Sequence, residues 1–146
     1  YQKHSLNTRT SLYLGISYLN LDSLQRATGY LQRTIEREAR GPVTEAFVQK
    51  GNVNDRRADV SDAVRAYKTA LRLRPERTDV YFHLANLYDE HYREKETAAL
   101  YYQQFLRVSD STHESLRPYA RDRLETLRST LHMQEARVSS ESTPEK

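Results

Sequence analysis

The chain has 146 residues, a mass of 17.1 kDa and a formal net charge of +3, which is the length of one ordinary domain. It contains no cysteine, so disulfide frameworks and thiol catalysis are excluded, and no run of about 18 apolar residues that would predict a membrane span. Leu and Ala are common while Ile numbers two, a composition that favours helices over strands.

Apolar residues recur at helical spacing along most of the chain, and no stretch shows sustained alternation. Gly41-Pro42 and Pro75 are expected to break this pattern, because proline and glycine interrupt regular structure. The polar run 138–146 is expected to be a disordered tail. In chain order the pattern predicts seven helices, over 7–21, 23–39, 43–54, 60–74, 78–91, 96–109 and 115–136.

Small residues recur at fixed spacing on successive pairs of these helices. Gly15, Gly51 and Ala85 follow one another at 36 and then 34 residues on the first helix of each pair. On the second helix of each pair, an alanine lies 12, 12 and 13 residues after the small residue of the first helix. Four residues after each alanine comes a large residue, which gives the pairs Ala27 with Leu31, Ala63 with Tyr67, and Ala98 with Tyr102. Helices approach closely only where side chains are small, so these positions predict where each pair packs.

This pattern resembles the tetratricopeptide repeat (TPR) family, whose period is about 34 residues, and a bacterial member is expected. The resemblance implies an all-α fold, a right-handed α-solenoid of about three helix pairs with a C-terminal capping helix. The repeat domain is expected over 1–137, with units at about 8–41, 44–77 and 78–110 and the capping helix at about 115–136.

The resemblance also implies a function, a non-catalytic protein–protein interaction scaffold. Members bind a segment or helix of another protein in the concave groove formed by the first helix of each pair. Asn52 and Asn86 occupy equivalent positions, where such proteins often hold a ligand backbone through the amide; solvated asparagine is the alternative. The groove positions of this chain are Tyr13, Ile16, Gln49, Asn52, Arg56, Phe82, His83, Asn86 and Asp89.

Acidic residues at further groove positions, Glu45 and Asp79, predict an acidic end that would repel the carboxylate that one TPR subclass clamps. No phosphate loop, nucleophile motif or metal-binding His pattern occurs, so neither an enzyme nor a cofactor or metal is expected.

Two alternatives to the scaffold stay open. Arginines of the convex face could bind nucleic acid or another anionic surface, although nucleic acid is the less favoured partner; they are Arg72, Arg74, Arg77, Arg117, Arg121 and Arg128. The chain could also be the docking part of a larger protein, because it begins at Tyr1 and is expected to be a fragment. The compartment is open between cytoplasm and a bacterial periplasm or cell envelope, and an exposed solenoid end could support oligomers.

Overall fold

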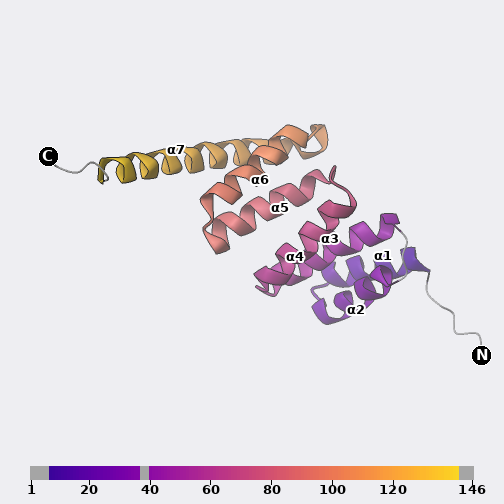
Figure 1. The fold of residues 1–146 in the computed structure, drawn as a ribbon. Coiled ribbons are helices and arrows are strands. Elements are labelled where there is room, and N and C mark those ends of the chain that lie inside the picture. Colours follow the sequence, from indigo (N-terminus) through magenta and orange to yellow (C-terminus); the bar gives the residue numbers. More distant parts are fainter. Residues whose placement is uncertain (1–6, 37–39, 142–146) are drawn as a thin grey trace, which may run out of the picture. The chain divides into compact units, whose positions relative to one another are not determined.

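The computed structural model describes residues 7–36 and 40–141, and every regular element in these ranges is helical. The helices are α1 (Thr8–Asn20), α2 (Leu24–Ile35), α3 (Arg40–Arg56), α4 (Val60–Leu73), α5 (Thr78–Leu87), α6 (Lys95–Val108) and α7 (Arg117–Glu141) (Figure 1). A π-helical turn, Tyr88–Tyr92, follows α5, and a 3₁₀ turn, Ser111–Leu116, precedes α7. None of the described helices is long and apolar enough to cross a membrane.

The chain forms two compact units, Tyr1–Val80 and Tyr81–Lys146, with the boundary inside α5. The single repeat domain over 1–137 stays a prediction. The two units are described separately below.

In the first unit, α1 packs on α2 and α3, and α3 packs on α4. The α1–α3 core holds the buried side chains of Leu12, Leu19, Leu31 and Val53, together with the small Ala27 and Ala46. Gly15 and Gly51 are points of close approach between helices. A Cβ built on Gly15 would lie 2.7 Å from Leu31 Cδ2, and one built on Gly51 would lie 2.4 Å from Tyr67 Cε1. The small residue of the first helix therefore packs against the large residue of the second helix, as predicted, in the α1–α2 pair and in the α3–α4 pair.

The first helix of each pair is followed by a residue with left-handed backbone. Asp22, Ala58 and Arg93 adopt left-handed backbone with φ of 57°, 59° and 55°, at intervals of 36 and 35 residues. The next amide closes each turn: Ser23 N–H donates to Tyr18 O at 2.8 Å, and Asp59 N–H donates to Asn54 O at 2.8 Å. Such six-residue closures satisfy carbonyls that a helix end leaves free.

The third turn differs by one residue, because Glu94 N–H reaches back six positions to Tyr88 O. The π turn Tyr88–Tyr92 accommodates this additional residue. It accounts for the spacing of 13 rather than 12 between Ala85 and Ala98.

In the second unit, α7 packs along α6. Ala120, Leu124 and Leu127 of α7 are buried, as are Ala98, Tyr102 and Phe105 of α6 and Leu84 and Ala85 of α5.

Two predicted boundaries are wrong. Gly41-Pro42 does not break the chain before the third helix, because α3 begins at Arg40 and includes both residues. Proline is tolerated in a first helical turn, where its missing N–H would have no intrahelical acceptor. The expected disordered tail is wrong for residues 138–141, which continue α7, while residues 142–146 lie outside the described residues.

Candidate functional site

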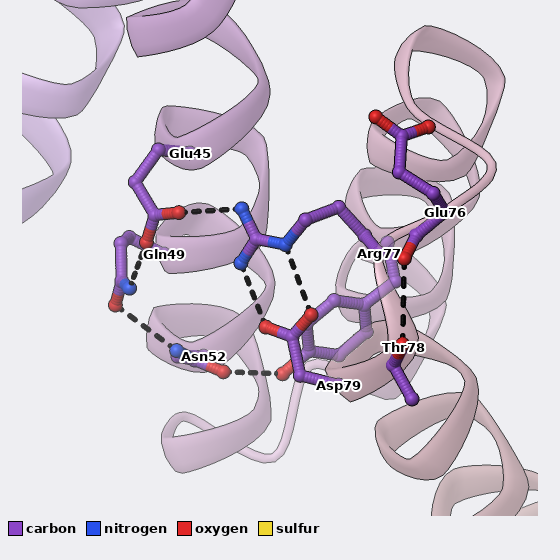
Figure 2. Close-up of polar contacts among 8 residues, drawn as sticks. Glu45, Gln49, Asn52, Glu76, Arg77, Thr78 and Asp79 are labelled. Atoms are coloured by element: carbon purple, nitrogen blue, oxygen red, sulfur yellow. Dashed lines mark hydrogen bonds and ion pairs between the residues drawn. The ribbon is translucent and has the colours of Figure 1, made fainter. Parts of the chain in front are cut away.

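Three polar side chains of α3 lie on one helix face and are joined by hydrogen bonds (Figure 2). Glu45, Gln49 and Asn52 follow one another at four and three residues, which places them in a row along the helix. Gln49 Nε2 donates to Glu45 Oε1 at 2.6 Å, and Asn52 Nδ2 donates to Gln49 Oε1 at 3.0 Å. All three side chains are half-buried.

Arg77 closes one end of this row (Figure 2). Its guanidinium donates to Glu45 Oε2 at 2.6 Å and to both oxygens of Asp79 at 2.7 and 2.9 Å. Hydrogen bonding to Asp79, and then to Glu45, raises the Arg77 pKa above its ordinary value despite the opposing effect of burial. Arg77 forms an ion pair with both Glu45 and Asp79, so the two carboxylates are held internally and one of their two negative charges is balanced.

Tyr67 of α4 closes the other end. Its hydroxyl donates to Asn52 Oδ1 at 2.6 Å, and its ring is fully buried. Burial, reinforced by the negative charges of Asp55 and Asp79, raises the Tyr67 pKa well above its ordinary value. The hydroxyl therefore stays protonated and acts as a permanent donor. We call the continuous set Tyr67, Asn52, Gln49, Glu45, Arg77 and Asp79 the α3 polar network.

The second unit repeats the tyrosine–asparagine bond. Tyr102 O–H donates to Asn86 Oδ1 at 2.6 Å, and burial is the main cause of its raised pKa. The two asparagines at equivalent repeat positions thus make the same contact to the second helix of their pair. Local sequence gives the equivalence of Asn52 and Asn86 but not this bond, which joins residues 15 and 16 apart.

The remaining candidate residues of the first unit differ in accessibility. Tyr13 is 65% exposed, whereas Ile16 packs against the α1–α3 core. Arg56 donates to the carbonyl oxygen of Leu19 at 2.8 Å and lies 3.9 Å from Asp22. Arg56 therefore caps the end of α1 instead of standing free in a groove.

In the second unit, α7 contacts two of the predicted groove residues. The Phe82 ring lies 5.8 Å from the Tyr119 ring of α7, and Asp89 is held by Arg123 through both carboxylate oxygens. The Asp89 side chain is only 5% exposed. Phe82 and Asp89 therefore contact α7 and are not a free binding surface. The His83 side chain is half-buried.

Most arginines assigned to a convex anionic site also make internal contacts. Arg117 donates to the carbonyl oxygens of Leu106 and Ser109 at 3.0 and 3.1 Å, so it caps α6. Arg74 lies 3.4 Å from Glu76. Arg121 and Arg128 are exposed.

Within residues 7–36 and 40–141, no three His, Asp or Glu side chains gather in a metal-binding arrangement. The sequence interpretation missed the roles of Arg77, Arg123 and Tyr67. Their contacts at 32, 34 and 15 residues depend on helix packing, and no local pattern reports them.

This geometry and the comparisons define a class of fold, a TPR-like helical repeat. Two crystal structures of MamA, a TPR-containing protein, are similar to the chain. The first has a TM-score of 0.65 and 19% sequence identity, and the match covers 89% of this chain and 81% of the MamA chain. The second has a TM-score of 0.65 and 20% sequence identity, and the match covers 96% of this chain and 80% of the MamA chain. No family model and no curated protein sequence matches the chain.

Proposed function

We propose that the chain is a non-catalytic protein–protein interaction scaffold. The proposed binding surface lies on α1 and α3 of the first unit and takes a segment of another protein. The TPR-like fold supports this proposal, because repeat folds of this kind supply extended binding surfaces.

The observation that carries the proposal is the way in which Asn52 is held. Tyr67 fixes its amide oxygen, and Gln49 accepts one hydrogen of its amide nitrogen. The nitrogen has a second hydrogen, which is available to a carbonyl of a bound chain. A donor already held in position loses little side-chain entropy on binding, so it contributes more to affinity than a mobile one.

Tyr13 supplies the exposed aromatic side chain that protein interfaces commonly use as an anchor. Arg56, Phe82 and Asp89 are omitted from the proposed surface, because each makes the internal contact described above. Ile16, Gln49 and Asn52 complete it in the first unit.

Affinity capture followed by titration of the retained partner tests this proposal. Tyr13→Ala removes an exposed ring and leaves the core intact, and we expect it to weaken binding about tenfold. Leu100→Ala, at a residue 60% exposed in the second unit, is the matched control and is expected to bind as wild type does. Equal affinity of the Tyr13→Ala variant and wild type would contradict the proposal.

A further inference from the structure

A ladder of two tyrosines and two arginines lies on the surface of the α1–α2 pair. The Tyr18 and Tyr30 rings stack with centroids 5.4 Å apart and an interplanar angle of 7°. Arg26 lies over the Tyr18 ring and Arg33 over the Tyr30 ring, each with Cζ 5.5 Å from the centroid. We call these four residues the α2 ladder. With Gly29 they line an open pocket of about 340 Å³.

Gly29 is the second observation that points to a ligand. Glycine in a helix interior lowers helix stability relative to alanine. Gly15 and Gly51 are required by packing, because a Cβ on either would overlap a side chain of the facing helix. A Cβ on Gly29 would meet no atom within 4 Å, so packing does not require this glycine. Its missing side chain instead leaves the pocket beside the ladder open.

The acidic residues nearest to Arg26 and Arg33 in the sequence are Asp22 and Glu36, which lie outside α2. Leu24–Ile35 contains no Asp or Glu, and neither Arg26 nor Arg33 forms an ion pair with a described carboxylate. A guanidinium that lies over a ring keeps N–H donors that can bind an oxyanion through two hydrogen bonds. The ladder therefore presents two positioned donors of the kind that carboxylate and phosphate groups bind.

We propose that the α2 ladder binds an acidic segment of a partner protein, with one side-chain oxyanion on each arginine. Arg26 and Arg33 are seven residues apart, a rise of about 10.5 Å along the helix. A polyproline II chain advances about 3.1 Å per residue with three residues per turn, so acidic side chains three residues apart share one face and lie at a similar spacing. The oxyanion is a carboxylate of Asp or Glu or the phosphate of a phosphorylated residue. This site shares no residue with the α3 polar network and does not depend on the function proposed for it.

Fluorescence anisotropy at low ionic strength tests this proposal with labelled peptides. The probe is Gly-Glu-Gly-Gly-Glu-Gly, with a version carrying Gln in place of Glu as the uncharged control and a phosphoserine version to distinguish the source of the oxyanion. The test variant is Arg26→Gln with Arg33→Gln. The matched control is Arg121→Gln with Arg128→Gln, because these exposed arginines of α7 are also seven residues apart and their loss changes the net charge equally.

We expect at least a tenfold loss of affinity for the better acidic peptide in the ladder variant and less than a twofold change in the control. Which acidic peptide binds more tightly identifies the oxyanion. Arg26→Lys with Arg33→Lys keeps the charge but loses the planar fork, so it is also expected to bind more weakly. Equal losses in the ladder and control variants, full binding by the lysine variant, or no binding of either acidic peptide to wild type would overturn the proposal. Circular dichroism confirms that each variant is folded.

Discussion

Substituting each helical glycine by alanine tests the packing of the first unit directly. At Gly51 the added Cβ would lie 2.4 Å from Tyr67 Cε1, about 1 Å closer than an ordinary van der Waals contact. The ring cannot swing aside freely, because it is fully buried and its hydroxyl is bonded to Asn52. Relief therefore requires α3 and α4 to separate.

The magnitude follows from three contributions. Overpacking a core costs about 1–3 kcal/mol. Loss of the Tyr67–Asn52 hydrogen bond adds about 1 kcal/mol. The higher helix propensity of alanine returns about 1 kcal/mol. We expect Gly51→Ala to lower the free energy of unfolding by about 1–3 kcal/mol.

Gly29→Ala is the matched control, because its Cβ would meet no atom within 4 Å. It is expected to raise the free energy of unfolding by about 0.5–1 kcal/mol through helix propensity and reduced chain entropy. Gly15→Ala should fall between the two, since its nearest atoms belong to the more adaptable Leu31 side chain. Urea unfolding followed by circular dichroism measures all three variants. Equal changes for Gly51→Ala and Gly29→Ala would refute the packing argument.

Three further predictions concern individual contacts. Arg123→Ala leaves the buried Asp89 without its cation, so the free energy of unfolding should fall by about 1–3 kcal/mol. Proteolysis of α7 should also become faster, and an unchanged rate of proteolysis would contradict the role assigned to this ion pair. Ala58→Gly should raise the free energy of unfolding, measured in urea, by about 1 kcal/mol, because φ of 59° strains any residue with a Cβ. A loss of stability would argue against this backbone conformation. Because the Tyr67 pKa is raised in the folded chain, its contribution to the free energy of unfolding is fully present below about pH 10 and is lost as pH rises above it, where the unfolded tyrosine ionises first. In the Tyr67→Phe variant, the free energy of unfolding should fall less steeply above about pH 10. The same steepness in the variant and the wild type would refute the assignment.

The positions where helices touch were predictable from sequence, because close packing demands small residues at repeat spacing. Gly15 and Gly51 were identified in this way, and the structure sets them against Leu31 and Tyr67. The additional residue before Ala98 was also visible in the sequence, although its form as a π turn was not.

The use of charged side chains was not predictable, because an ion pair depends on which helices meet. Asp89 has the spacing of a groove residue, but Arg123 of α7 covers it. Tyr18 packs against the edge of the α1–α3 core, and its half-buried ring also stacks on Tyr30 in the α2 ladder. Helical periodicity specifies the face on which a residue lies, and tertiary packing decides what covers that face.

Site-specific photo-crosslinking tests most directly the central claim that α1 and α3 of the first unit bind a protein segment. A photoreactive phenylalanine analogue replaces the exposed Tyr13 in one variant and the exposed Leu100 in the other, and both are irradiated with the captured partner. We expect crosslinks at position 13 that map to one continuous segment of the partner, and none at position 100. Crosslinks only at position 100, or none at position 13 while the complex stays intact, would contradict it.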